Sequence, residues 1–248
     1  MLEIEALYIV IFFLIITIQT IIGVGVLVLG TPIMLLLNHT LPEIIQILLP
    51  ISILTSLINI FYFNVSNKKN KFKISKETIK FFFCLCIPSI FIGTIILKNF
   101  YEFINFKIFV SFIIFLSLLI KLFSKDNILV FSNFKKKIFL TTIGLIHGLT
   151  NSGGSLLSIF FLALNGNSKS ETRYDTTFFY LFLAFFQFII FMLFFEINFS
   201  IKLILNYIGI ICIGVIFGNI IERKIGKKVF SLLVDLLALL AGIFLIIL

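Results

Sequence analysis

The sequence predicts an all-α polytopic membrane protein, and its composition and hydropathy pattern carry that prediction. Of the 248 residues, 60% are hydrophobic and only 12% are charged, and the mean hydropathy is +1.22. A soluble domain of this length could not bury so much apolar surface. Apolar runs close to the roughly 20 residues of a spanning helix recur from end to end, whereas a membrane β-barrel would show alternating segments of about ten residues.

Eight hydrophobic elements follow one another along the chain, at residues 5–37, 43–63, 78–97, 104–123, 138–164, 176–195, 201–221 and 229–248. The first and the fifth each contain a glycine-bearing interruption, GVG at 23–25 and NSGG at 151–154, and the first is too long for one straight span. The other six are apolar runs joined by short connections that carry nearly all the charges. We therefore expect the first and fifth elements to be broken or re-entrant helices.

A shift of 128 residues superimposes the two interruptions and indicates an internal repeat. The shift pairs Gly23 with Asn151, Gly25 with Gly153, Gln19 with His147, Glu43 with Glu171, and Asn59 with Gln187. After a three-residue shortening, Gly93 pairs with Gly218 and Lys98 with Arg223. Matched polar residues in apolar surroundings arise by chance less readily than matched leucines. The chain is predicted to hold a first transmembrane repeat at 1–123, a basic linker at 124–137 and a second repeat at 138–248.

The formal charge of +9 is interpreted as the positive-inside bias of membrane loops, and no nucleic-acid partner is expected. If all eight elements cross the membrane, the 20 Lys and Arg divide into 12 and 8 between the two sides, with both termini cytoplasmic. If the first and fifth elements turn back at their breaks, the division is 17 and 3, with both termini external. The second arrangement obeys the rule better and makes the halves inverted repeats, a common transporter architecture.

The sequence offers no motif for catalysis, for a cofactor or for a metal. The first residues, 1–7, carry Glu3 and Glu5 but no basic residue, so a cleavable signal peptide is not expected. Cys84, Cys86 and Cys212 have no spacing typical of zinc or of a disulfide framework. No acidic pair lies in an apolar segment, and no Walker loop, HExxH, GxSxG or nucleotide fingerprint occurs. We expect a protein that is not an enzyme and that needs neither a cofactor nor a metal.

The two breaks are the candidate binding site. Lipid cannot satisfy the backbone groups that a helix break frees, and a helix that starts after the break directs free N–H groups and a positive dipole end into it. Such a place favours an anion. The predicted substrate-binding residues are Gly23, Gly25, Asn151, Ser152, Gly153, Gly154 and Ser155. The alternative is a kink or a close helix–helix contact of small residues.

Other polar residues in the apolar elements are candidates for the same site. His147, the only histidine inside an apolar element, is the candidate for proton coupling; alternatively its neutral imidazole is hydrogen-bonded between helices. Gln19, Asn59, Thr150 and Gln187 are candidates to line a cavity, or else they join helices by hydrogen bonds. Asp235, near the start of the last element, is interpreted as a partner of loop lysines.

Two segments of the chain resemble the TauE/SafE sulfite exporter family, also called the 4-toluene sulfonate uptake permeases. The first is GVGVLVLGTP, Gly23 to Pro32, followed by NHTLPE; the second is NSGGSLLSIF followed by SETRYDTT. Together with four hydrophobic elements per half, the resemblance covers nearly the whole chain. It places Asp175, Thr176 and Thr177 where the family has a threonine-serine stretch, which adds Thr176 and Thr177 to the cavity-lining candidates. Departures from the family pattern are Asn151 and Ser155 for glycines, Phe160 for a proline, and Leu48 and Leu49 for a threonine-serine pair.

The resemblance implies a secondary transporter, a permease for small sulfur-containing or organic anions such as sulfite, sulfonates or sulfoacetate, coupled to protons. We expect a multi-pass protein of a bacterial inner (cytoplasmic) membrane whose partners are the lipid bilayer, a small anion and protons. Two alternatives stay open. One is a non-transport membrane assembly factor or redox partner, and the other is an anion channel.

Overall fold

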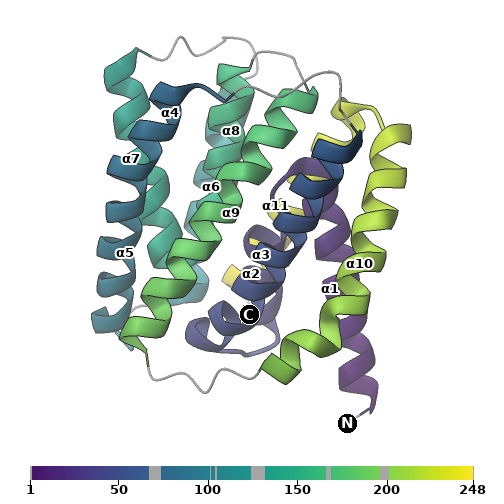
Figure 1. Cartoon of the computed structure of the whole chain (residues 1–248). Coiled ribbons are helices and arrows are strands. Elements are labelled where there is room, and N and C mark those ends of the chain that lie inside the picture. Colours follow the sequence, from purple (N-terminus) through teal and green to yellow (C-terminus); the bar gives the residue numbers. More distant parts are fainter. Residues whose placement is uncertain are drawn as a thin grey trace.

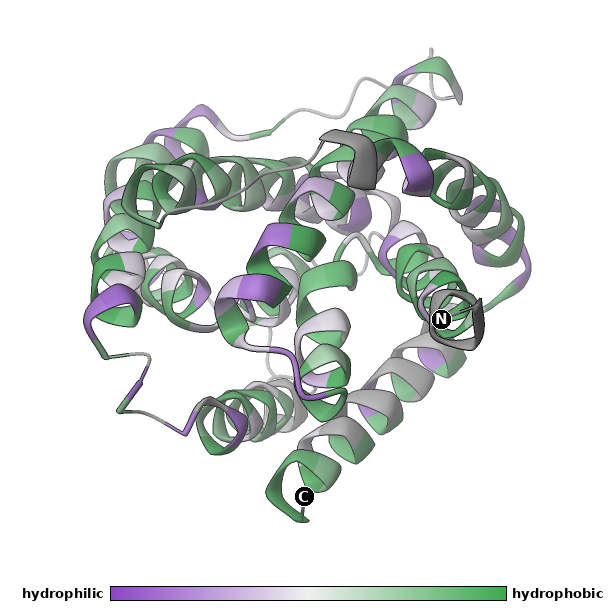
Figure 2. Ribbon diagram, turned by 90° about the horizontal axis from the view of Figure 1, so that it is seen from below, coloured by the Kyte–Doolittle hydropathy of each residue, from purple (hydrophilic) through white to green (hydrophobic). Residues whose placement is uncertain are grey.

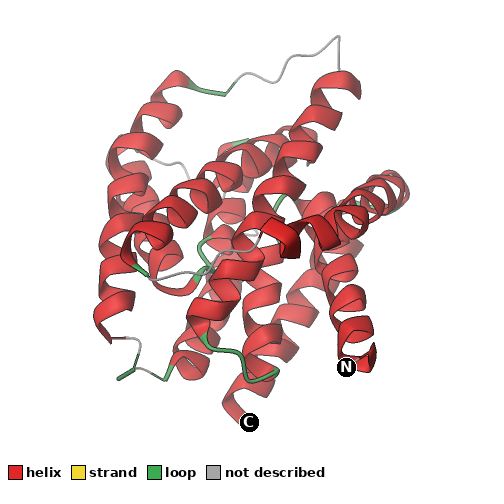
Figure 3. Cartoon of the chain, turned by 60° about the horizontal axis from the view of Figure 1, so that its bottom comes forward, coloured by secondary structure: helices red, strands yellow, loops and turns green. Residues whose placement is uncertain are grey.

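A computed structural model describes residues 2–66, 74–100, 102–103, 105–123, 132–165, 169–195 and 201–247. Within these ranges the regular structure is helical throughout, without a strand (Figure 3). The first half of the chain holds α1 (Leu2–Ile22), α2 (Val26–Leu36), α3 (Leu41–Ser66), α4 (Lys76–Phe81), the π-helical turn η1 (Phe82–Cys86), α5 (Ile87–Phe100) and α6 (Phe106–Phe123). The second half holds α7 (Asn133–Thr150), α8 (Gly154–Leu164), α9 (Lys169–Phe194), α10 (Ile201–Lys224) and α11 (Lys227–Ile247). The predicted all-α class is confirmed.

The first and fifth hydrophobic elements are each a helical hairpin that turns back at its break. Figure 1 shows α1 rising from the N-terminus and α2 returning to the same end of the molecule. The hydroxyl of Tyr8, early in α1, lies 2.5 Å from Nε2 of His39, just beyond α2, so these segments are neighbours. In the second hairpin, the rings of Phe139 and Phe160 stack with centroids 5.8 Å apart. The two elements are therefore re-entrant, as the distribution of Lys and Arg favours.

The helix ends that flank the four most basic connections gather at the upper end of the molecule in Figure 1. These connections comprise residues 64–80, 121–137, 165–175 and 222–228, and they hold 17 of the 20 Lys and Arg. Both chain ends lie toward the opposite, lower end. Full crossing by all eight elements, the first of the two arrangements considered, is not the one that the chain adopts.

One element boundary was predicted wrongly. The sixth element starts at Lys169 and not at residue 176, so that Arg173 and Asp175 belong to α9 rather than to the preceding connection. The physical reason is that the polar first turns of α9 are buried against other helices. Arg173 is only 5% exposed and Asp175 only 8%, and both side chains have protein partners.

The two hairpins share a geometry at positions 128 residues apart. Helix α1 ends with a bond from Gly23 N to Gln19 O of 2.7 Å, and α7 ends with one from Asn151 N to His147 O of 2.9 Å. The same shift relates three such pairs of backbone bonds, the other two being Leu29 to Gly25 with Leu157 to Gly153, and Leu37 to Ile33 with Asn165 to Phe161. Each hairpin is packed mainly against the other half of the chain, α1 on α10 and α7 on α5. The division at 124–137 stays a prediction, and residues 124–131 lie outside the described residues.

The outer surface is apolar, as a bilayer requires. Figure 2 shows hydrophobic residues along the helices around the rim of the molecule. Exposed side chains include Ile213 and Ile216 of α10, each more than 60% exposed, and such contiguous apolar exposure is foreign to soluble proteins. In the described part of the chain, four helical segments have the length and composition to cross a membrane, namely Leu41–Ser66, Lys76–Phe100, Lys169–Phe194 and Leu205–Lys224. The chain is a multi-pass membrane protein.

Candidate functional site

The first break is built from glycines because no side chain fits there. Gly23 has φ of +98°, a conformation that L side chains rarely adopt, and a Cβ added to it would lie 2.9 Å from the carbonyl oxygen of Arg173. A Cβ on Gly25 would lie 2.7 Å from the backbone nitrogen of Gln19. The break therefore brings α1, α2 and α9 into direct backbone contact.

The first two N–H groups of α2 are bound by side-chain oxygens. Gln19 Oε1 accepts from Val26 N at 3.0 Å, and its Nε2 donates to Ser52 O at 3.1 Å and to Ser56 Oγ at 3.0 Å. The next N–H group, that of Leu27, donates to the hydroxyl of Tyr180 at 3.1 Å. Gln19, a predicted cavity-lining residue, thus acts as the cap of α2.

A buried cationic cluster closes the other side of the first break. Arg173 Nε donates to Thr20 O at 2.8 Å, at the negative end of the α1 dipole, and one of its terminal nitrogens donates to Asn219 Oδ1 at 2.8 Å. The other terminal nitrogen lies 3.2 Å from a carboxylate oxygen of Glu222, which also pairs with Lys169 at 2.7 Å. This cluster joins α1, α9 and α10.

Sequence reasoning missed Arg173 and its partners. The residue was counted as a loop charge because the sixth element was predicted to start at 176. A signal was present, since residues 169–175 contain neither glycine nor proline and continue directly into an apolar run. Asn59, predicted to line a cavity, lies beside this cluster and donates from Nδ2 to Thr20 Oγ1 at 3.1 Å.

The second break has the same plan with different side chains. Asn151 takes φ of +63°, which asparagine tolerates better than most residues, and so ends α7 as Gly23 ends α1. A Cβ on Gly153 would lie 2.6 Å from the Cβ of His147, and one on Gly154 would collide with the ring of Tyr180. Both glycines are therefore required by close packing.

The serine side chains at the second break bind inside the protein. Ser152 Oγ donates to Thr150 O at 3.1 Å, and Ser155 Oγ donates to Ser152 O at 3.0 Å and lies 2.9 Å from Ser117 Oγ of α6. The side-chain Nδ2 of Asn151 donates to Thr31 Oγ1 of α2 at 3.4 Å, which joins the two hairpins. The role of these residues as anion ligands stays a prediction.

Several polar atoms around the breaks are buried without a hydrogen-bond partner. Both ring nitrogens of His147 have none, and neither do Asn151 Oδ1, Thr176 Oγ1 and Gln187 Oε1; Asn59 Oδ1 and Thr172 Oγ1 complete the set in the described part of the chain. His147, Asn151, Thr176 and Gln187 are fully buried. Buried polar atoms are normally paired, so each of these requires a reason, such as a ligand. At the first break, both polar side-chain atoms of Gln19, the counterpart of His147, are hydrogen-bonded. The two breaks therefore differ in whether this side chain has partners.

Helix α9 connects the two breaks through one face. Thr176 and Thr177 lie against Gly23, Tyr180 reaches the start of α2, and Gln187 Nε2 donates to His147 O at 2.9 Å. The ring of Tyr180 is fully buried, lies against Gly154 at the start of α8, and has its centroid 6.3 Å from that of His147. Tyr180 thus touches the starts of both half-helices. Sequence reasoning missed it, because only the packing of α9 against the two hairpins brings it there.

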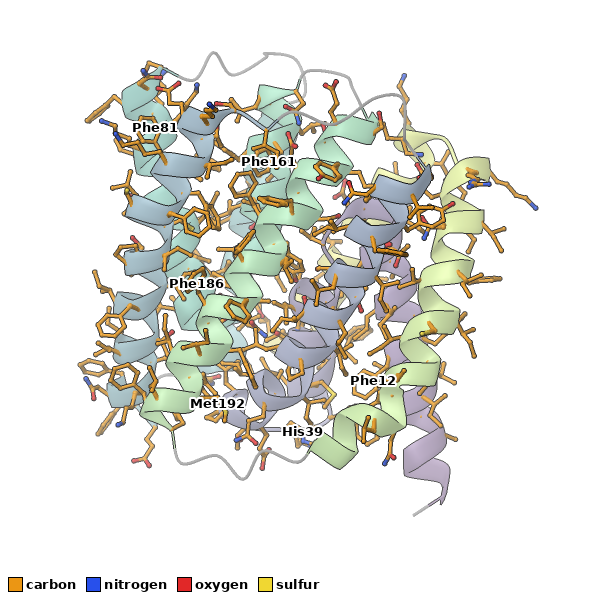
Figure 4. All side chains as sticks on the ribbon, in the orientation of Figure 1. Phe12, His39, Phe81, Phe161, Phe186 and Met192 are labelled. Carbon is orange, nitrogen blue, oxygen red and sulfur yellow. The ribbon has the colours of Figure 1, made fainter. Side chains whose placement is uncertain are left out.

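Other polar residues lie away from the breaks. His39 lies at the lower end of the molecule (Figure 4), beside Tyr8 and with Nδ1 3.6 Å from a carboxylate oxygen of Glu43. Asp175 of α9 accepts from Nδ2 of Asn165, the residue after the end of α8, at 2.7 Å. Among the described residues, no three His, Cys, Asp or Glu side chains gather as metal ligands, and the three cysteines are free.

Comparison with known proteins gives one result. The family model described as Sulfite exporter TauE/SafE matches residues 8–245. No match is found among the curated proteins, nor among the solved structures.

Proposed function

We propose that this chain, which belongs to the TauE/SafE sulfite exporter family, moves small sulfur-containing or organic anions across the cytoplasmic membrane. The substrates are of the sulfite, sulfonate and sulfoacetate class, and their movement is coupled to protons. The observation that carries the proposal is the second break, where fully buried polar atoms without partners adjoin the start of a half-helix.

The chemistry of this break suits an anion. Helix α8 starts at Gly154, and its first N–H groups and the positive end of its dipole face the break. The glycines at 153 and 154 allow His147 and Tyr180 to pack directly against the backbone at the start of this helix. His147 and Asn151 stand beside them with unpaired polar atoms.

His147 supports the proton coupling. A protonated imidazole at this place would be a buried charge without a counter-ion, and such burial is costly. An anion bound at the start of α8 supplies the counter-ion, so that the proton and the anion favour each other's binding. The pair then crosses with less net charge than the anion alone.

Uptake into proteoliposomes tests the proposal. Purified protein is expected to give saturable uptake of radiolabelled sulfite or methanesulfonate, stimulated by a pH gradient. Gly153→Leu should abolish uptake, since even a Cβ at Gly153 meets His147 and Ile143. The matched control is Gly209→Leu, because a Cβ at Gly209 meets no atom within 4 Å.

His147→Gln should lose the stimulation by the pH gradient. Folded wild-type protein that takes up none of a panel of small anions would refute the proposal.

A further inference from the structure

We infer that the hydroxyl of Tyr180 occupies the place of a substrate oxygen at the start of α2, and that a bound anion displaces it. The inference rests on the proposed function. It makes Tyr180 a residue that competes with the substrate, a role that neither the family match nor the positions of the breaks assign.

The first argument is the bond that the hydroxyl makes. Leu27 N lies in the first turn of α2, and its hydrogen bond to the Tyr180 oxygen is 3.1 Å long. An N–H group in the first turn of a helix binds either a capping oxygen or an oxygen of an anion. Gln19, on the same hairpin, provides a local cap for Val26. The oxygen at Leu27 instead comes from the other half of the chain.

The second argument is the set of unpaired atoms around the same place. Thr31 is one turn beyond Leu27 on the same face of α2, and Asn151 reaches it from the second break. Asn151 Oδ1 and both nitrogens of His147 are fully buried and unpaired, and the His147 ring faces that of Tyr180 in a T-shaped contact. Unpaired polar atoms therefore lie close to the Tyr180 ring and to Thr31, one turn from the N–H group that the Tyr180 hydroxyl binds.

The third argument is the difference between the two halves. The residue 128 positions before Tyr180 is Ser52, whose hydroxyl lies 3.4 Å from Oε1 of Gln19 within its own half. Only the longer tyrosine spans from one half to the other. An anion that binds between the half-helices must exchange with this hydroxyl, whereas a ligand without an acceptor oxygen gains nothing there.

Equilibrium binding to Tyr180→Phe tests the inference. The substitution keeps the ring against Gly154 but frees Leu27 N, so sulfite and methanesulfonate should each bind about three- to tenfold more tightly than to wild type, the equivalent of one net hydrogen bond. Tyr8→Phe, which removes a hydroxyl that contacts His39, is the control and should leave Kd unchanged. An unchanged or weaker Kd in Tyr180→Phe overturns the inference alone. Wild-type protein that binds neither anion overturns the proposed function and the inference with it.

A second measurement leaves Tyr180 in place, and so decides the question if Tyr180→Phe does not fold. The chain has six tyrosines, and biosynthetic 3-fluorotyrosine gives each a ¹⁹F resonance. Five single Tyr→Phe variants, at positions 8, 62, 101, 174 and 207, identify the resonance of Tyr180 as the one that none removes. Saturating methanesulfonate should shift the Tyr180 resonance, with sodium gluconate at equal ionic strength as control. A resonance unchanged while methanesulfonate binds overturns the inference.

Discussion

Gly23 is the residue at which the effect of backbone strain on stability can be tested most directly. Alanine there would have to keep φ near +98° and place its Cβ 2.9 Å from the Arg173 carbonyl oxygen. We expect Gly23→Ala to lower the free energy of unfolding by about 1–3 kcal/mol. Gly209→Ala, inside α10 with open space around it, should be neutral or stabilising by up to about 1 kcal/mol. Unfolding in detergent measures both, and a Gly23→Ala protein as stable as wild type would contradict the strained conformation.

Arg173 stabilises the fold through the buried polar groups that its guanidinium pairs. Its guanidinium serves Thr20 O, Asn219 Oδ1 and Glu222 together, and it stacks over the Phe63 ring at 4.5 Å. Arg173→Gln leaves the carbonyl and part of the carboxylate unpaired, so we expect a loss of about 2–3 kcal/mol in unfolding free energy. Arg223→Gln is the control, because Arg223 is exposed, and it should change stability by no more than about 0.5 kcal/mol. Equal effects of the two substitutions would show that the buried cluster does not stabilise the fold.

At the scale of helices, matched glycines allow each hairpin to approach the other half closely. A Cβ on Gly93 of α5 would lie 2.5 Å from Leu145 O of α7, and a Cβ on Gly218 of α10 would lie 2.6 Å from the Cβ of Thr20 in α1. All three atoms nearest to a Cβ on Gly93 belong to the backbone, the closest at 2.5 Å, whereas the nearest backbone atom at Gly218 is Thr17 O at 2.9 Å. We therefore expect Gly93→Ala to cost about 1–3 kcal/mol and more than Gly218→Ala. Thermal unfolding of the two variants gives the order, and the reverse order would contradict this account.

The elements were predictable to the extent that they depend on local sequence. Glycine-bearing interruptions and apolar runs are visible in the residues themselves, and both breaks lie where they were predicted. The start of α9 left only a weak local signal, the lack of glycine and proline at 169–175, because the burial of Arg173 and Asp175 depends on residues distant in the sequence. The same limit applies to the candidate site. His147 and Asn151 stand out in the sequence as polar residues in apolar surroundings, whereas Tyr180 is one of many aromatic residues and its role depends on tertiary contacts with Leu27 and Gly154.

At the scale of the molecule, the packing of the hairpins on opposite halves suggests how transport occurs. Helices α3 and α9 pack against each other, and each binds the end of the first helix in a hairpin, α3 through Ser56 at Gln19 and α9 through Gln187 at His147. A movement of one half against the other must therefore change the environment of both breaks together. Inverted repeats around a shared site are how many secondary transporters alternate access.

The orientation of the whole chain follows from the re-entrant hairpins and is open to direct test. The end that carries 17 of the 20 Lys and Arg should face the cytoplasm. In a protein whose native Cys84, Cys86 and Cys212 are replaced by serine, single cysteines are placed at three positions. They replace Asn133 and Gly226, which are exposed near that end, and Phe103, which is 82% exposed at the other. In intact cells, a membrane-impermeant maleimide should label Phe103→Cys alone, and inside-out vesicles should reverse the pattern. If all eight elements crossed, Asn133 and Gly226 would face opposite sides, so labelling of Gly226→Cys from outside would contradict the hairpin topology.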